Sequence, residues 1–209
     1  MMHIDRYLSY SELAEHEVEG TDFTITVSRR PFSAVAVIAP HGGKIESRTS
    51  EIARAIAGED FNLYLFEGIK KRGNYAALHI TSRRFDEPSC LELLSTCSFV
   101  IAIHGCVGGD ERVLIGGLDY TLKNKVAIEL QQAGVDVQND GHQFQATDPS
   151  NICNRGQSNR GVQLELTGAL RKNANWQLVA EAVRAALLPL QTAAYLSSES
   201  HYFQSGERM

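Results

Sequence analysis

The sequence of 209 residues lacks any long apolar run, and this absence excludes a membrane-spanning helix. Its longest apolar stretches, AVAVIA and FVIAI, are far shorter than the roughly 20 residues that cross a bilayer. The first residues carry acidic side chains early and lack the continuous apolar segment of a secretory signal peptide. We therefore expect a chain without a membrane partner that stays in the cytoplasm unless cell lysis releases it.

Cysteine is scarce, and its spacing is not that of a redox or zinc-finger motif. Cys90, Cys97, Cys106 and Cys153 form no CxxC pair. Disulfides belong mainly to oxidising compartments, and no secretion signal is visible here. We predict free thiols at all four positions.

An excess of positive charge is also missing. The chain carries 20 lysines and arginines against 25 acidic residues, which gives a formal net charge of −5. A field of this sign repels nucleic acid. We therefore expect no nucleic-acid partner.

The composition and length are those of one globular unit. Hydrophobic residues make up 43% of the chain and charged residues 22%, which allows a packed core. Neither an internal repeat nor a low-complexity linker divides the sequence, so we predict a single domain over residues 1–209. The polar tail after about residue 197 is predicted to be flexible.

Stretches of β-type sequence alternate with helical patterns. We predict strands at 21–28, 33–39, 61–67, 75–81, 98–104, 112–117, 135–138 and 161–166, and helices at 47–57, 86–96, 118–133 and 175–193. The central strands are continuously apolar, which is typical of strands covered on both faces. The alternation predicts an α/β fold, a three-layer α/β/α sandwich around a mixed, mostly parallel sheet.

Two of the predicted strands end in the dipeptide His-Gly. SAVAVIA runs into PHGGKIE, which carries His41 and Glu46, and SFVIAI runs into the HGCVGGDER segment that begins at His104. Ligands of open α/β sheets bind outside the carboxyl ends of the strands. Two imidazoles and one carboxylate, with a fourth position left for water, form the ligand set of a catalytic zinc. We predict His41, Glu46 and His104 as zinc ligands.

Simpler explanations exist for the same residues. An HGG sequence can be only a tight turn, and a buried histidine can be a hydrogen-bonded core residue. Cys106, two residues after His104, could be a softer ligand or a small buried side chain.

The strand GVQLEL contains a carboxylate that needs an explanation. Alternation places Glu165 on the face of Gln163, opposite the apolar side chains of the strand. Burying a carboxylate is costly unless it is paired or lies near a cation. Near a zinc ion Glu165 would be a general base and then a general acid, and we predict it as the catalytic residue. The alternative is a solvent-facing glutamate on an edge strand.

Basic and polar residues fall in the predicted loops. The basic ones are Lys44, Arg83, Arg84, Arg112, Arg155 and Arg160. Arginine binds carboxylates bidentately, so several arginines together would suit an anionic substrate. LHITSRRFDEP adds a histidine at another strand end, which could bind substrate or be merely hydrogen-bonded. The predicted substrate-binding residues are His79, Thr81, Arg112, Arg155 and Arg160.

Other catalytic motifs are incomplete. PHGG is similar to the HGGG oxyanion loop of esterases, but GQSNRG has one residue too many for the GxSxG nucleophile elbow. GCVGGDE and GGLD match neither GxGxxG nor GxxxxGK[ST]. We therefore expect zinc and no organic cofactor.

Five segments resemble the poly-γ-glutamate hydrolases of bacteriophages and their bacterial relatives, across roughly residues 35–170. They are APHGGKIES, ALHITSRRFDEP, AIHGCVG with VLIGG, and NRGVQLEL. The resemblance implies a fold similar to that of zinc carboxypeptidases, zinc ligands at His41, Glu46 and His104, and a catalytic Glu165. Zinc carboxypeptidases usually place two residues between their first histidine and glutamate, whereas Gly42 to Ile45 lie between them here.

These observations predict a monomeric zinc hydrolase of γ-glutamyl amide bonds whose partner is an anionic polymer, poly-γ-glutamate. For a phage, the resemblance implies removal of a capsule made of this polymer. Two alternatives stay open at this point: a zinc deacylase of small N-acyl amino acids, and a non-catalytic metal- or anion-binding module.

Overall fold

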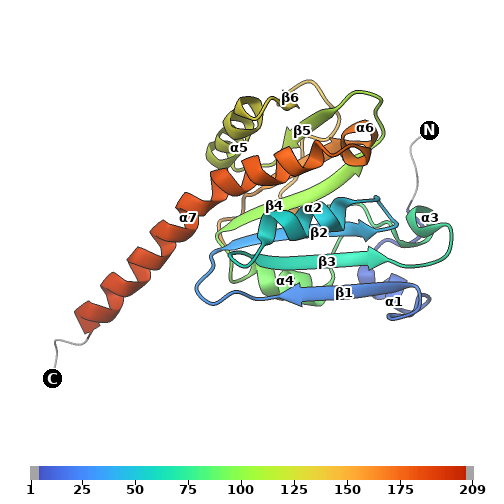
Figure 1. Cartoon of the computed structure of the whole chain (residues 1–209). Helices are drawn as coiled ribbons and strands as arrows, with labels where there is room; N and C mark the ends of the chain where they lie inside the picture. The colour runs from blue at the N-terminus through green and yellow to red at the C-terminus, as the bar shows by residue number, and fades with distance from the viewer. Residues whose placement is uncertain (1–4, 206–209) are drawn as a thin grey trace.

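The computed structural model describes residues 5–205, without the side chains of residues 192–205, and shows helices packed on a seven-stranded sheet (Figure 1). The strands are β1 (Phe23–Ser28), β2 (Val35–Gly43), β3 (Asn62–Gly68), β4 (Phe99–Cys106), β5 (Arg112–Gly116), β6 (Asp136–Gln138) and β7 (Val162–Thr167). The helices are α1 (Tyr10–Ala14), α2 (Thr49–Ala57), α3 (Asn74–Leu78), α4 (Pro88–Leu94), α5 (Tyr120–Gln132), the 3₁₀ turn η1 (Ile152–Asn154), α6 (Gly168–Lys172) and α7 (Trp176–Ser205).

The sheet is mixed, with the parallel strands at its centre. The strand order is β1-β3-β2-β4-β7-β5-β6. Strands β3, β2, β4 and β7 are parallel to one another, β1 and β5 are antiparallel to β3 and β7, and β6 is parallel to β5. The carboxyl ends of β2, β4 and β7 therefore lie at one edge of the sheet.

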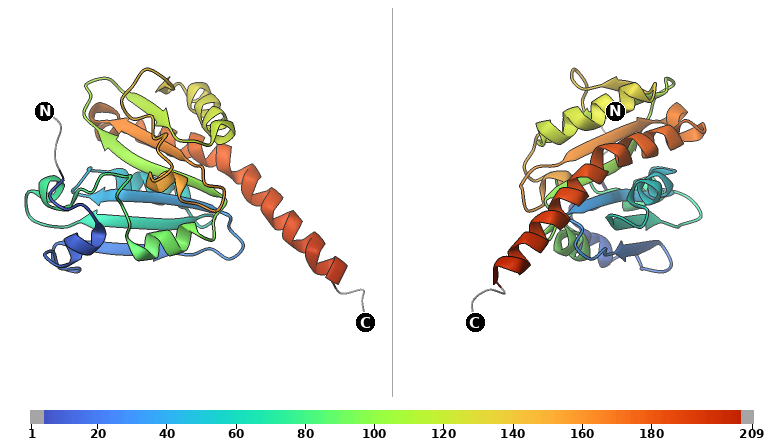
Figure 2. Two further views of the ribbon diagram at one scale, coloured as in Figure 1. Left: turned by 180° about the vertical axis from the view of Figure 1, so that it is seen from behind. Right: turned by 60° about the vertical axis from the view of Figure 1, so that its left-hand side comes forward.

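Apolar side chains fill both faces of the sheet, as the continuously apolar strands predicted. One face, here called the α7 face, packs against α2, α5 and α7. The other, the α4 face, packs against α1, α3, α4 and η1. In Figure 1 α2 and α7 cross in front of the sheet, and in the rear view of Figure 2 α4 comes forward. The predicted three-layer α/β fold is confirmed.

One predicted strand is wrong. Residues 75–81 begin within α3 instead of forming a strand. Gly73 precedes the helix in the left-handed conformation, and the alanines and leucine of NYAAL are good helix formers. The apolar run packs on the α4 face through Ala77 and Leu78 at helical spacing, which a short apolar window does not distinguish from a strand.

The carboxyl-terminal tail and the cysteines can be compared with the predictions from the sequence. Helix α7 runs to Ser205 and so includes most of the polar tail, whose last four residues lie outside the described ones; the flexibility of that tail stays a prediction. None of the helices within residues 5–205 is both long and apolar enough to cross a membrane. All four cysteines lie in this part of the chain, and each is buried and free, as predicted.

A β-bulge interrupts β2 just before it ends. Ala39 lies opposite Leu65 of β3, and Gly42 lies opposite Glu67, so β2 holds one residue more than β3 over this interval. A bulge of this kind reverses the alternation of side chains beyond it.

The reversal decides which face receives His41. Ile38 packs on the α4 face, so regular alternation would direct Pro40 to that face and His41 to the opposite one. Instead, the His41 ring lies 6.3 Å from the ring of Phe85, centroid to centroid, among the residues of the α4 face. The bulge thus turns the histidine toward the layer that carries the other polar residues of this edge.

The glycines after the bulge allow β2 to approach β3 closely. Gly43 has a φ of +62°, and a Cβ there would lie 2.7 Å from the carbonyl oxygen of Gly68. Gly73 has a similar φ of +72° but open space around it.

We expect Gly43→Ala to lower the free energy of unfolding by about 2–4 kcal/mol, because it adds a backbone clash to the cost of the left-handed conformation. The matched variant Gly73→Ala should lose only about 1 kcal/mol, since it meets the conformational cost alone. Urea unfolding of both variants measures the difference. Equal losses would show that close approach at Gly43 is unimportant.

Candidate metal centre

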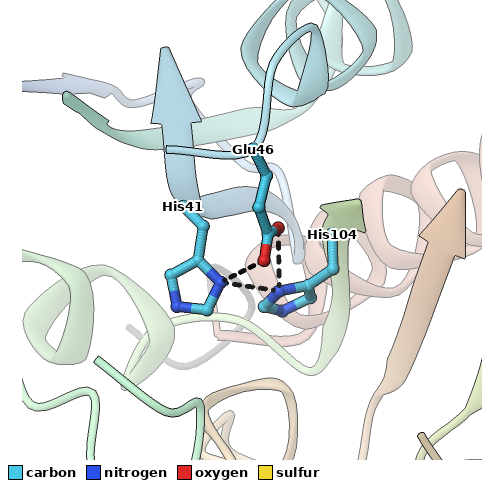
Figure 3. A group of neighbouring side chains, drawn as sticks. All are labelled: His41, Glu46 and His104. Carbon is cyan, nitrogen blue, oxygen red and sulfur yellow. Dashed lines mark hydrogen bonds and ion pairs between the residues drawn. The ribbon is translucent and has the colours of Figure 1, made fainter. Parts of the chain in front are cut away.

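Three buried side chains converge at the carboxyl edge of the sheet (Figure 3). His41 comes from β2, Glu46 from the loop that follows it, and His104 from the neighbouring strand β4. The Nδ1 atom of His41 lies 3.1 Å from Oε1 of Glu46 and 3.1 Å from Nδ1 of His104. Nδ1 of His104 lies 3.6 Å from Oε2 of Glu46. The structure therefore brings together the three residues predicted as metal ligands.

The backbone of the loop returns Glu46 to His41. The Glu46 N–H donates to the carbonyl oxygen of His41 at 3.0 Å, and the hydroxyl of Thr49 donates to the carbonyl oxygens of both residues. The carboxylate is held from the β4 side as well, because the N–H of Gly105 donates to its Oε2 at 2.8 Å.

The segment after α3 orients both histidines. Nε2 of His41 lies 2.8 Å from the carbonyl oxygen of Ile80, which can only accept, so this nitrogen carries a proton. Nε2 of His104 faces the hydroxyl of Ser82 at 3.5 Å. Both Nδ1 atoms are thereby directed inward. An outer hydrogen bond of this kind fixes the ring and tautomer of a metal-binding histidine.

The donor set fits a zinc ion. Tetrahedral coordination with bonds of about 2.0–2.1 Å separates neighbouring ligand atoms by about 3.3 Å, close to the separations found here. Two imidazole nitrogens and a carboxylate are a common ligand set of catalytic zinc. Lone pairs that face one another at 3.1 Å repel unless a proton or a metal ion lies between them.

The pKa values of the three groups are coupled to one another. Burial opposes ionisation of Glu46, but His41 and His104 outweigh it and hold the pKa of this carboxyl far below its usual range. Burial would lower the pKa of His41, yet the carboxylate of Glu46 raises it. Burial lowers the pKa of His104.

Glu165 lies beside the cluster on β7. It is paired with His104 across the parallel strands, so both side chains lie on the α4 face. Gln163 donates to its Oε1 at 2.9 Å, and the amide of Asn151 donates to Gln163 in turn at 3.0 Å. Burial raises the pKa of Glu165 well above its usual range, and the charge of Glu46 adds to this.

The position of Glu165 excludes the alternative that it is a solvent-facing glutamate on an edge strand. Strand β7 lies between β4 and β5, and the side chain is 6% exposed. It is therefore not a solvent-facing residue of an edge strand.

His79 and Thr81 also lie near the cluster, held by one carboxylate. Asp5 accepts from Nδ1 of His79 at 2.7 Å and from the backbone N–H of Thr81 at 2.8 Å. Nε2 of His79 lies 3.9 Å from Oε1 of Glu46. Burial, and then the charge of His41, lower the pKa of His79 to about 4, so the ring is neutral at pH 7.

The arginines predicted from the sequence are not brought to this cluster. Arg112 pairs with Asp136 at 2.6 Å. Arg155 and Arg160 are exposed and precede β7, so they lie toward the amino end of the strand, whereas Glu165 lies toward its carboxyl end. Their roles in substrate binding stay predictions.

Arg171 of α6, which sequence reasoning missed, binds the backbone beside three site residues. Its guanidinium donates to the carbonyl oxygens of Leu166 at 3.0 Å, Cys106 at 3.1 Å and Ser47. These carbonyls lie one residue after Glu165, two residues after His104 and one residue after Glu46. A Cβ on Gly105 would lie 2.5 Å from the guanidinium carbon, so the glycine makes room for this contact.

A cavity of about 790 Å³ opens beside Glu46. Its wall includes Tyr75, the glycine-rich segment 105–109 at the end of β4, and the basic residues Arg48, Arg171 and Lys172. The site thus combines a metal-ligand cluster with an adjoining space large enough for a small ligand or part of a polymer.

Residues 7–183 match the model of the poly-gamma-glutamate hydrolase family. The UPF0714 protein YndL of Bacillus subtilis (strain 168) is 36% identical over 171 residues, which are 81% of this chain and 66% of YndL. The match therefore spans slightly less than two thirds of that relative.

Two solved structures are similar over most of the chain. A bacteriophage poly-gamma-glutamate hydrolase superposes with a TM-score of 0.86 at 31% identity, over 91% of this chain and 100% of that one. The zinc-free apo form of YndL superposes with a TM-score of 0.81 at 31% identity, over 88% and 98% of the two chains.

We expect Arg171→Met to weaken zinc binding about 10-fold or more, because the three segments that carry site residues lose their common donor. Arg184→Met is the matched control, since Arg184 also donates to a backbone carbonyl, that of Ile56, and pairs with Asp60 at the far end of α2. Both variants should lose about 1–3 kcal/mol of stability. Only Arg171→Met should change zinc affinity in chelator competition, and equal affinities would contradict the role assigned to Arg171.

Proposed function

The chain belongs to the poly-gamma-glutamate hydrolase family, and from this we propose that it hydrolyses γ-glutamyl amide bonds of poly-γ-glutamate with a zinc ion held by His41, Glu46 and His104. The observation that carries the proposal is the convergence of the three buried donor atoms, which all lie within 4.8 Å of one another. The zinc-free form in which YndL was solved supports the choice of metal.

A zinc ion bound at this cluster supplies Lewis acidity toward the amide carbonyl and a water molecule whose pKa falls to about 7. The protein residues fix where this chemistry takes place. The carbonyl of Ile80 and the hydroxyl of Ser82 hold the two imidazoles, and Gly105 holds the carboxylate of Glu46.

Glu165 moves the proton. Because Gln163 occupies its Oε1, we assign the proton transfer to Oε2, which takes the proton of the attacking water and delivers it to the leaving amine. Burial raises the pKa of this carboxyl, and a neighbouring cation would lower it again, so its affinity for a proton depends on the loaded site. A carboxyl poised in this way can serve first as base and then as acid.

The metal and the substrate can be tested together. We expect the purified protein to hold a single zinc ion per chain by mass spectrometry and to shorten poly-γ-glutamate on gels, and His41→Ala to lose both properties. His142→Ala should keep both, since His142 is half-buried but bonds the carbonyl of Ile115, away from the cluster.

Other outcomes of these zinc and cleavage measurements would indicate other functions. Zinc binding with cleavage of small N-acyl amino acids but not of the polymer would favour a deacylase. Zinc binding without any hydrolysis would favour a binding module. A wild-type protein without zinc would overturn the mechanism.

The role of Glu165 has its own test. We expect Glu165→Gln to keep zinc and to reduce the rate of polymer cleavage by a factor of about 10²–10⁴, the usual contribution of a general acid or base. Glu92→Gln makes the same chemical change at an exposed position paired with Arg29 and should leave the rate unchanged. If Glu165→Gln cleaves at the wild-type rate, another group moves the proton.

A further inference from the structure

The cavity beside Glu46 has an excess of positive charge. Its charged residues are Glu46 and three basic residues, Arg48, Arg171 and Lys172. A zinc ion on Glu46 would make the balance still more positive. The whole chain is negative, so this local field is a property of the cavity and favours an anionic ligand there.

The three basic side chains of the cavity differ in their contacts. The guanidinium of Arg171 donates hydrogen bonds to the carbonyl oxygens of Ser47, Cys106 and Leu166. Arg48 and Lys172 are exposed at the wall of the cavity. These two side chains are therefore the ones placed to meet a ligand.

Arg48 has a backbone conformation that an arginine rarely adopts. Its φ is +74°, in the left-handed region, at the residue that caps the amino end of α2. Its guanidinium carbon lies 5.8 Å from the ring centroid of Trp176. An arginine over an aromatic face keeps the N–H groups at its edge available for a carboxylate. Backbone strain of this kind is concentrated at functional sites.

A second cavity of about 460 Å³ shares Arg48 with the first but differs in charge. Its charged residues are Lys44, Arg48 and Arg54 against Glu51 and Glu67, and Arg54 pairs with Glu67 at 2.8 Å. The excess of positive charge is therefore smaller in this second cavity than in the cavity beside Glu46.

We propose that the cavity between Arg48 and Lys172 is a subsite for a carboxylate of the substrate chain next to the bond that is cleaved, and that Arg48 is its specificity-determining residue. The inference rests on the proposed function, because it takes Glu46 as a zinc ligand. In poly-γ-glutamate the γ-carboxyl forms the amide, so each residue offers a free α-carboxylate. The ligand of the subsite is the α-carboxylate of a residue adjoining the scissile amide.

The substitution Arg48→Gly separates binding from folding. It removes the side chain and at the same time relieves the left-handed backbone, so the variant should be at least as resistant to urea as the wild type. We expect KM for poly-γ-glutamate to rise about 10-fold with kcat and zinc content little changed, since the lost contact is made before the reaction as well as during it. The dependence of kcat/KM on salt should weaken as well.

Two further variants act as controls. Asn159→Gly relieves a left-handed backbone with φ of +53° on the stretch before β7, and it should leave KM unchanged. Arg48→Lys keeps the positive charge but loses the paired N–H groups with which a guanidinium binds a carboxylate, so its KM should lie between those of the wild type and Arg48→Gly.

A polymer whose α-carboxylates are methyl esters tests the ligand itself. The wild type should bind it about 10-fold more weakly than the acid form, and Arg48→Gly should add no further loss. An unchanged KM in Arg48→Gly on the acid polymer, or an equal loss on both polymers, would overturn the subsite. Failure of the wild type to cleave poly-γ-glutamate at all would instead overturn the proposed function.

Discussion

Three buried atoms that can each offer a lone pair face one another at the edge of this sheet, and they can remain so close only with a proton or a metal ion between them. The Nδ1 atoms of His41 and His104 are 3.1 Å apart, and the carboxylate of Glu46 contacts both rings. Repulsion between lone pairs grows as water is excluded. Much of the local architecture enforces this costly arrangement: a bulge in β2, a turn through two glycines, and hydrogen bonds from the outer layer that fix each ring.

The cavity at the same edge allows a protein of negative net charge to favour an anionic ligand. At physiological ionic strength charges are screened beyond about 8 Å, so a ligand in the cavity responds to the residues of its wall and little to the net charge of −5. Arg48 and Lys172 supply that local charge, while Arg171 is committed to backbone carbonyls. Basic residues that line one cavity can therefore have different roles: Arg48 and Lys172 are placed to bind a ligand, whereas Arg171 holds the backbone of the site.

The sequence allowed much of this to be predicted, for identifiable reasons. Apolar strands that end in His-Gly follow from the general geometry of parallel sheets, so the convergence of His41, Glu46 and His104 could be expected. The bulge and the carbonyl of Ile80 could not, because both depend on contacts between distant segments.

The arginines on the two sides of β7 differ in their position relative to the site. Ligands gather at the carboxyl ends of strands. This rule favours residues that follow β7, such as Arg171, over those that precede it, such as Arg155 and Arg160. The helix α3 was missed for a different reason: its five residues are too few for helical periodicity to stand out from an apolar strand.

The outer hydrogen bonds of the site span nearly the whole described chain, from Asp5 beside His79 to Arg171 beside Glu46. Since no short segment contains the complete arrangement, metal affinity is acquired only when distant parts of the chain have docked. Binding and folding are then thermodynamically linked, and free zinc at 100 times its dissociation constant would add about 2.7 kcal/mol to the stability of the native state. Under the proposed zinc binding, the supply of zinc would in this way influence how long the protein survives proteolysis.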